Sequence, residues 1–198
     1  MSTLPEWVSD PTSLTLDEEQ YDALPDRVRK LIEVVDGNII QCHSGSIEHS
    51  NVARRLANKL EAAKPDDPCM GVVTDVDMRL AKRIRKGGKF SFRRPDVLVH
   101  KCIPRGTRLS AADALMAVEV VSPGSVTADT IDKLAEFAFE GIPVYLVVFL
   151  DGDLFVKAVH EYRLDWANRI YRLAEIHEDE LVLEKPIRVA IPFSALDD

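Results

Sequence analysis

The sequence of 198 residues lacks a long hydrophobic run. Its longest continuously apolar stretch covers residues 144–150, far short of the roughly 20 apolar residues that a membrane helix needs. The first residues include acids and prolines, where a signal peptide would have a basic and then an apolar region. These two absences predict a cytoplasmic protein.

Cysteine is also scarce. The three cysteines, Cys42, Cys69 and Cys102, are odd in number and widely separated. This pattern matches neither a disulfide framework nor a paired zinc motif. We therefore expect all three to be small core or edge residues, with no redox or metal–thiolate role.

Basic residues are fewer than acidic ones: the sequence has 25 basic and 33 acidic residues, and its net charge is −8. Taken as a whole, this balance argues against nucleic acid as a partner. The distribution is uneven, however: residues 82–94 (KRIRKGGKFSFRR) hold seven of the basic residues and no acid. Such a local basic patch is typical of a protein that contacts phosphate at one place. The alternative is a solvated hairpin tip that its charge keeps soluble.

The hydrophobic pattern predicts a mixed α/β protein, with an irregular arm over residues 1–15 and a single domain over 16–198. Helical spacing of apolar residues predicts helices at 47–63 and 126–140, and one or two short helices are expected within 16–31. Strands are predicted at 31–41 (a hairpin), 72–80, 92–99, 114–121 and 144–150. A C-terminal antiparallel extension is predicted at 154–160, 169–174 and 181–191.

Two acidic residues stand where a charge is costly. Asp96 follows Pro95 and leads directly into the apolar residues 97–99, and Glu119 lies inside the β-branched run AVEVVSPG. An unpaired charge in a buried strand costs several kcal/mol. Asp96 could instead form a salt bridge with a neighbouring arginine, and Glu119 could belong to a buried ion pair.

The spacing of these two acids suggests a metal site. They lie 23 residues apart in the sequence, which lets two neighbouring strands bring them side by side. Adjacent carboxylates repel each other unless a cation lies between them, and ligation by oxygen alone suits Mg²⁺ or Mn²⁺. The sequence therefore predicts that Asp96 and Glu119 bind a divalent ion.

Four short motifs in order resemble the Uma-two family of restriction-endonuclease-like proteins, a branch of the PD-(D/E)XK nuclease superfamily. They are RPDVLV at 94–99, AVEVVSPGS at 117–125, DTIDK at 129–133 and GIPVY at 141–145. The resemblance runs from about residue 33 to residue 150. It implies a restriction-endonuclease-like core, in which helices flank a central mixed sheet, and Mg²⁺- or Mn²⁺-dependent hydrolysis of DNA phosphodiester bonds.

The resemblance also implies roles for individual residues. Asp96 and Glu119 match the acids that bind the metal in the family. Glu33, in the segment IEVVDG, matches its N-terminal acidic motif, although Glu33 could equally lie on an exposed strand face. His49 matches the histidine before the first long helix and could donate to a phosphate, but a helix cap is an alternative role.

The sequence departs from the superfamily pattern at two places. Val121 stands where the usual lysine follows the second acid, and Lys133 in DTIDK is the candidate that replaces it from the following helix. Lys133 could instead form an i,i+4 pair with Asp129 on an exposed helix. The second departure is GIPVYLVVFL, which lacks the glutamate, tryptophan and nearby acid of the usual GVPEYW segment.

These observations predict a metal-dependent endodeoxyribonuclease with Asp96, Glu119, Lys133 and Glu33 as its catalytic residues. A homodimer is expected, because two sites related by a two-fold axis can cut both strands of a duplex. One alternative is a nuclease fold without turnover that binds DNA or protein, and another is a hydrolase of small phosphodiesters, which needs no basic hairpin. The residues predicted to contact DNA are Arg83, Arg85, Lys86, Lys89, Arg93, Arg94 and His49.

Overall fold

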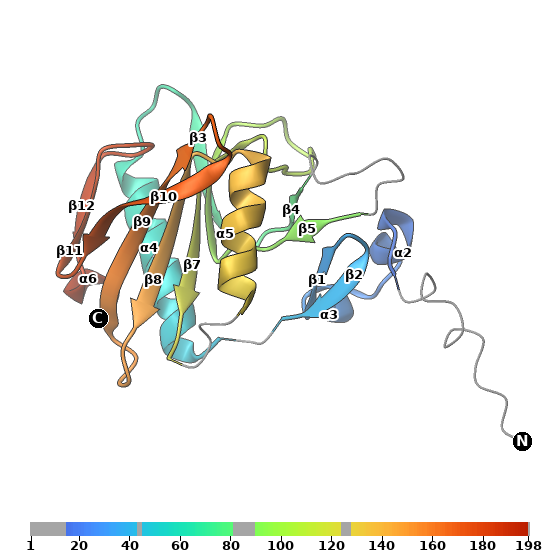
Figure 1. The fold of residues 1–198 in the computed structure, drawn as a ribbon, viewed down its shortest axis with the longest axis horizontal. Coiled ribbons are helices and arrows are strands. Elements are labelled where there is room, and N and C mark those ends of the chain that lie inside the picture. The colour runs from blue at the N-terminus through green and yellow to red at the C-terminus, as the bar shows by residue number, and fades with distance from the viewer. Residues whose placement is uncertain (1–14, 43–44, 81–89, 124–127, 198) are drawn as a thin grey trace, which may run out of the picture.

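The computed structural model describes residues 15–42, 45–80, 90–123 and 128–197 (Figure 1). Most of the predicted N-terminal arm lies outside the described residues. The same holds for four of the predicted DNA contacts: Arg83, Arg85, Lys86 and Lys89. Within the described part of the chain, no helix combines the length and the apolar character needed to cross a bilayer.

A six-stranded mixed sheet forms the centre of the fold, in the order β10-β9-β8-β7-β6-β3. β7 and β8 run parallel, and the other neighbouring strands of this sheet are antiparallel. This architecture confirms the predicted mixed α/β class. The strands are β3 (Met70–Thr74), β6 (Val97–Lys101), β7 (Ala114–Val121), β8 (Val144–Leu150), β9 (Val156–Asp165) and β10 (Ile170–His177).

Helix α5 (Ala128–Glu140) connects the two parallel strands. A parallel pair requires a crossover of this kind, because the chain must return to the starting end of the sheet. Gly141 ends the helix with a φ of 90°, and its N–H group bonds to the carbonyl of Phe137. This left-handed conformation favours glycine. The turn then leads into β8.

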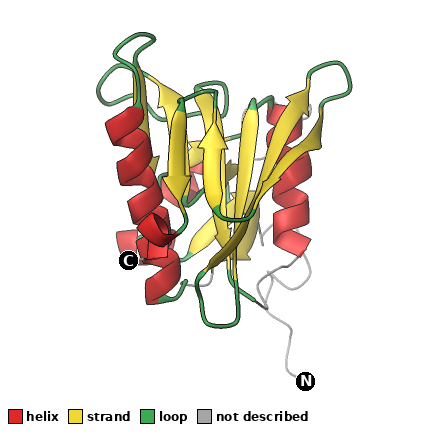
Figure 2. Ribbon diagram, turned by 90° about the vertical axis from the view of Figure 1, so that its left-hand side faces the viewer, coloured by secondary structure: helices red, strands yellow, loops and turns green. Residues whose placement is uncertain are grey.

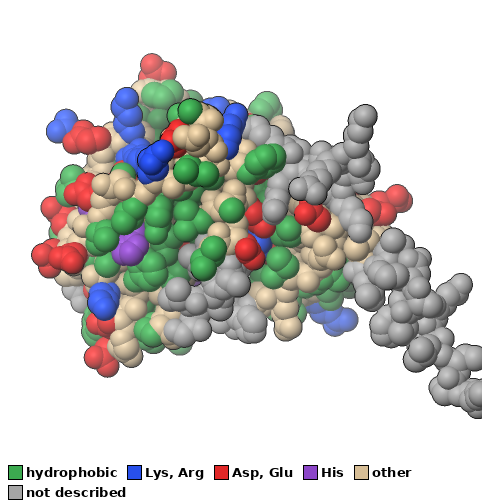
Figure 3. Space-filling view, in the orientation of Figure 1, with side chains coloured by type: hydrophobic (Ala, Val, Ile, Leu, Met, Phe, Trp, Pro, Cys, Tyr) green, Lys and Arg blue, Asp and Glu red, His purple; other side chains and the backbone are tan. Residues whose placement is uncertain are grey.

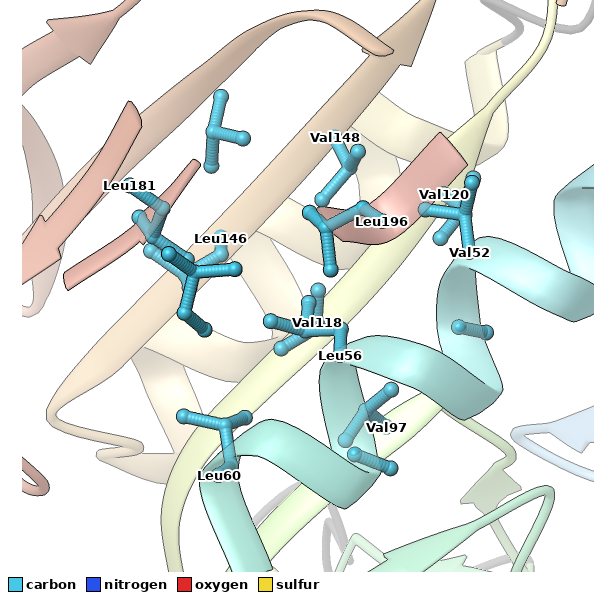
Figure 4. Packing of buried hydrophobic residues seen from close by; sticks show 14 of the residues in the cluster. Val52, Leu56, Leu60, Val97, Val118, Val120, Leu146, Val148, Leu181 and Leu196 are labelled. Carbon is cyan, nitrogen blue, oxygen red and sulfur yellow. The ribbon is translucent and has the colours of Figure 1, made fainter. Parts of the chain in front are cut away.

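The two faces of the sheet pack against different helices, α4 (Ile47–Ala63) and α5 (Figure 2). Alternate strand residues point to opposite faces, so Val97 and Leu98 of β6 belong to different core clusters. On the α4 face, Leu56 and Leu60 pack in the same cluster as the β-branched residues of β6 to β8 (Figure 4). Burial on both faces explains why β6, β7 and β8 read as continuous apolar runs.

The C-terminal segment covers part of the α4 face. It forms the two-stranded sheet of β11 (Glu180–Leu183) and β12 (Val189–Pro192), followed by α6 (Ser194–Asp197). Its buried leucines, Leu181, Leu183 and Leu196, join the cluster under α4. The predicted antiparallel extension therefore divides in two, because β9 and β10 continue the central sheet and β11 and β12 pack across it.

A second, four-stranded sheet has the order β2-β1-β5-β4 and lies beside α5 in Figure 1. Its strands are β1 (Ile32–Val35), β2 (Asn38–Gln41), β4 (Met78–Arg79) and β5 (Phe92–Arg93), and the short helices α2 (Glu18–Asp22) and α3 (Asp26–Arg29) precede them. Two predicted strands are each split between the sheets: 72–80 becomes β3 and β4, and 92–99 becomes β5 and β6. Asp75, at φ 51°, and Pro95, which has no N–H group, lie at the breaks.

The expectation that the cysteines are unpaired was wrong for two of them. Cys69 and Cys102 form a disulfide with a Cα–Cα distance of 5.5 Å, and Cys42 takes no part in this bridge. The register of β3 and β6, with Met70 opposite Lys101, places these two cysteines opposite each other at the end of the ladder. Because 33 residues separate them in the sequence, only the strand pairing reveals their proximity.

Candidate active site

A cleft of about 1140 Å³ lies between the four-stranded sheet, called the small sheet below, α4 and the end of β7. All four predicted catalytic residues line it: Glu33 from β1, Asp96 before β6, Glu119 from β7 and Lys133 from α5. The structure therefore brings together residues from four separate elements. Their roles in catalysis remain predictions.

Asp96 and Glu119 lie next to each other across two antiparallel strands. Val97 of β6 pairs with Val118 of β7. The same register places Asp96, which precedes Val97, opposite Glu119, which follows Val118. Asp96 Oδ2 accepts a hydrogen bond of 2.7 Å from the backbone N–H of Val120. This bond fixes the aspartate beside the strand that carries the glutamate.

Glu119 is almost fully buried, with 8% of its surface exposed. Its Oε2 atom lies 3.0 Å from Lys133 Nζ, whereas its Oε1 atom has no hydrogen-bond partner among the described residues. Burial raises the pKa of Glu119 to about 8; Lys133 opposes the rise, and the negative charges of Asp96 and Glu33 add to it. A buried carboxylate oxygen without a partner suggests a place for a cation or an ordered water.

Lys133 is buried and points into the cleft rather than along the helix surface. Its Nζ atom contacts Glu119 Oε2 at 3.0 Å and Glu33 Oε1 at 3.7 Å. The side chain is 6% exposed, so it does not lie on an exposed helix face. The side chain of Asp129 lies outside the described residues, so the i,i+4 pair with Asp129 stays a prediction. Val121, at the position of the usual lysine, is buried in the core on the α5 side.

Arg93 is buried away from solvent, and its predicted role in DNA binding was wrong. Its side chain is 1% exposed, and its guanidinium group lies between Glu33 Oε2, at 2.8 Å from Nη1, and Glu136 Oε2, at 2.7 Å from Nε. Burial by itself would lower the pKa of Arg93, but the contacts with Glu136 and Glu33 raise it above its ordinary value. Arg93 thus links β1 to α5 and is not accessible to a phosphate.

His49, near the start of α4, contacts one of the two central acids. Its Nε2 atom lies 3.1 Å from Asp96 Oδ2, and its backbone N–H bonds to the N-cap residue Ser46. The hydrogen bond with Asp96 raises the pKa of His49, against the effect of burial. The ring therefore orients Asp96, and its predicted contact with DNA remains a prediction.

Arg94 forms part of the wall of the cleft. Its side chain bonds to Asp77 Oδ1, at 2.6 Å from NH2, and its backbone N–H donates to Glu33 Oε1 at 2.7 Å. These contacts hold the small sheet against the loop after β3. The DNA contact predicted for Arg94 remains untested.

Two residues of this region are not among those predicted from the sequence. Asp75 lines the cleft, and burial raises its pKa with a further contribution from Asp96. Glu136 is buried one helical turn after Lys133 and holds Arg93. The spacing of three residues between Lys133 and Glu136 was a usable signal, since such residues share a helix face. Nothing in the local sequence marked Asp75, because its position depends on the break between β3 and β4.

The fold has a counterpart among solved structures. A crystal structure of a "putative nuclease belonging to DUF820" from Anabaena variabilis superposes with a TM-score of 0.64 at 13% identity, covering 91% of this chain and 97% of that one. The molecule therefore has a nuclease-like α/β fold. None of the curated proteins matches the chain.

A family model assigns the chain more narrowly. The model described as "Putative restriction endonuclease", Uma2, matches residues 18–193. The chain belongs to this family. The match includes all three sheets, both long helices and every residue that lines the cleft.

Proposed function

We propose that the protein is a Mg²⁺- or Mn²⁺-dependent endonuclease that hydrolyses phosphodiester bonds in DNA. The observation that carries this proposal is the environment of Glu119. Its carboxylate is buried, has one oxygen without a partner among the described residues and lies beside Asp96. Such an arrangement is costly for an unpaired charge, and a cation would offset the cost.

The donor set fits a hard divalent ion. Asp96 and Glu119 would hold the ion. Glu33, which contacts Lys133 Nζ as Glu119 does, would assist them. Within the described part of the chain, both contacts of Asp96 use Oδ2, which leaves Oδ1 for another ligand. Mg²⁺ and Mn²⁺ prefer carboxylate oxygens and water. A bound ion of this kind lowers the pKa of its water and stabilises charge on a phosphoryl oxygen.

The remaining residues orient the reacting groups. Lys133 would position or activate the attacking water and offset the charge that develops on the phosphate. His49 fixes the orientation of Asp96 through the contact with Oδ2, and Arg93 fixes Glu33 through an ion pair of 2.8 Å. These buried contacts make the site rigid, which electrostatic stabilisation requires.

Double-stranded DNA is the proposed substrate, and a homodimer is the proposed assembly. Because Arg93 is buried between two glutamates, contacts with the DNA backbone would fall on the other residues of the 82–94 segment that are predicted to make them. These are Arg83, Arg85, Lys86, Lys89 and Arg94.

Cleavage of supercoiled plasmid in Mg²⁺ or Mn²⁺ tests the proposal. Asp96→Ala and Glu119→Gln should each abolish cleavage, and Lys133→Met should lower the rate about a hundredfold or more while divalent binding persists. Glu180→Gln, which makes the same change at an exposed glutamate of β11, should cleave as the wild type does. Cleavage that survives Asp96→Ala and Glu119→Gln would contradict the assignment.

Calorimetric titration with Mn²⁺ separates the nuclease from a binding module of the same fold. The wild type should bind the ion, and Glu119→Gln should lose that binding while its circular dichroism spectrum stays unchanged. A protein that binds DNA but shows no divalent affinity would favour the module without turnover.

A further inference from the structure

The two edges of the central sheet differ in their exposure. At one edge, β3 is mostly buried or half-buried. At the other edge, β10 exposes five consecutive residues, from Arg172 to Ile176. Natural proteins usually protect a free edge with proline, lysine or a covering segment. β10 contains neither proline nor lysine, and six of its eight side chains are exposed.

Large hydrophobic side chains are concentrated at this edge. Leu173 and Ile176 of β10, on the face of the sheet that α5 covers, are 49% and 46% exposed, and Phe139 of α5 is 49% exposed; Ile170 is 48% exposed on the opposite face. Figure 3 shows that hydrophobic side chains gather over α5 and the neighbouring strands β8 to β10. An apolar surface of this kind next to an open strand edge indicates a protein-binding surface.

A β-bulge determines which side chains of β10 share a face. The register of β10 against β9 shifts between Leu173 and Glu175. As a result, Arg172 lies opposite Arg163 and Glu175 opposite Glu161, two positions of β9 that point to the same face. Without the bulge, residues three apart would point to opposite faces. Arg172 and Glu175 therefore share one face of the sheet.

This arrangement makes β10 complementary to a second copy of itself. An antiparallel pair with its two-fold axis between Leu173 and Ala174 places Arg172 opposite Glu175 of the second copy, twice. The same axis pairs Tyr171 with Ile176. In both pairs the partners lie on the same face, as an antiparallel ladder requires.

Arg172 and Glu175 can each form a further ion pair across this interface. Arg172 is 67% exposed and uses Nε and NH2 to bind Asp165, which leaves NH1 for a second acceptor. Glu175 is 62% exposed, and its carboxylate lies 4.0 Å from His177 Nδ1. Opposite charges that face each other across two strands stabilise the pairing.

We propose that two copies of this chain associate through antiparallel pairing of their β10 strands, which joins two six-stranded sheets into one continuous sheet. This interface rests on the homodimer put forward with the proposed function and specifies its surface. A two-fold axis perpendicular to the sheet keeps both α5 helices on the same side. Both Glu119 side chains then lie on that side as well, where they could act on one duplex.

Molar mass in solution tests the interface over a micromolar concentration series. The wild type should have twice the 22.2 kDa of the chain, and Leu173→Lys should be a folded monomer because lysine on an edge strand prevents pairing. Ile39→Lys provides the matched control, since Ile39 of β2 is 51% exposed on the other sheet, and it should remain dimeric. A monomeric wild type, or a dimeric Leu173→Lys, would overturn the proposal.

Charge reversal tests the register. Arg172→Glu and Glu175→Arg should each weaken the dimer about tenfold, because two symmetric attractive pairs become repulsive. The double variant should recover most of the affinity, because the pairs are restored with their charges exchanged. A double variant weaker than both single variants would rule out this register.

Plasmid cleavage distinguishes a failure of this interface from a failure of the proposed function. If both proposals hold, the wild type linearises plasmid and Leu173→Lys mainly nicks it. If no variant cleaves, the proposed function fails, while the molar masses still decide the interface. If Leu173→Lys is a monomer that linearises plasmid as fast as the wild type, the dimer has no part in cutting both strands, and the arrangement of the two sites over one duplex is wrong.

Discussion

Glu119 shows how one residue connects the sequence pattern to the chemistry. It occupies a strand position whose neighbours, Val118 and Val120, are buried in the core. Its carboxylate would be expensive there without compensation. Lys133 compensates one oxygen at 3.0 Å, and the other oxygen has no partner among the described residues. This carboxylate can therefore bind either a proton or a cation.

The first prediction concerns the pH dependence of metal binding at Glu119. Because burial raises the pKa of this carboxyl to about 8, the group holds a proton below that pH, and a cation must displace the proton. The apparent affinity for Mn²⁺ should therefore rise by up to about tenfold per pH unit below pH 8 and level off above it. Calorimetry in two buffers of different ionisation enthalpy measures the release of the proton.

The control for this measurement is the residual divalent affinity of Glu119→Gln, which should be weak and vary little with pH in this range. Binding without proton release below pH 8 would contradict the raised pKa of Glu119.

Individual site residues differed in how far the sequence could predict them. Asp96 and Glu119 stood out because each is a charge at the start of, or within, an apolar strand. Lys133 came from the resemblance, since an i,i+4 partner at Asp129 offered an equally ordinary explanation. Arg93 was misassigned because it belongs to a basic run, and sequence alone does not show that β5 turns this side chain inward between two glutamates.

At the scale of elements, α5 and β5 form the frame of the site. Lys133 and Glu136 lie on one face of α5, and Glu136 binds Arg93 of β5 with two hydrogen bonds, of 2.7 and 3.1 Å. Arg93 in turn binds Glu33 of β1. The small sheet is thus joined to the crossover helix through the buried Arg93, beside the contact between Lys133 and Glu33.

The second prediction concerns the stability that this ion-pair network contributes. Arg93→Met should lower the free energy of unfolding by about 3–5 kcal/mol, because it removes the buried guanidinium that pairs with the carboxylates of Glu33 and Glu136. Arg188→Met, the same substitution at an 84% exposed arginine, should change stability by less than about 1 kcal/mol. Urea denaturation of both variants at the same pH gives the comparison.

An additional variant shows whether charge or packing is responsible. Arg93→Met/Glu33→Gln/Glu136→Gln removes the charges together and should recover part of the stability. If Arg93→Met were as stable as the wild type, the buried network would not be what joins the small sheet to α5.

The elements themselves were largely predictable, and their partition between sheets was not. Both long helices and the buried strands β7 and β8 follow from local periodicity and apolar runs. The splits at Asp75 and Pro95 depend on a single positive φ and on which sheet offers a pairing partner, and neither can be read from periodicity. For the same reason, the proximity of Cys69 and Cys102 became visible only with the register of β3 and β6.

At the scale of the whole molecule, charge distribution decides how DNA can approach. The chain carries a net charge of −8, which repels phosphate over most of the surface. The proposed function nevertheless makes DNA the substrate. Binding would then depend on a small basic region, and the segment 82–94 is the only long run of basic residues without acids in the sequence. The single domain over residues 16–198 stays a prediction.

The third prediction is that a few residues determine the salt dependence of DNA binding. Alanine at Arg83, Arg85, Lys86 and Lys89 together should weaken binding to a short duplex in Ca²⁺, an ion chosen to limit cleavage. The slope of log K against log salt should become shallower by about 0.9 for each phosphate that the variant no longer neutralises, up to about 3.6. Fluorescence anisotropy over a salt series measures both quantities.

A matched variant separates this segment from general charge effects. Alanine at four basic residues exposed elsewhere, Lys59, Lys157, Lys185 and Arg188, makes the same change in net charge. Because those residues lie outside the segment, the variant should keep the wild-type slope and most of its affinity. Equally weak binding by the two variants would mean that no localised basic patch binds DNA. A segment variant that still cleaves small phosphodiesters but no longer cuts plasmid would show that the 82–94 segment serves DNA and not the chemistry at Asp96 and Glu119.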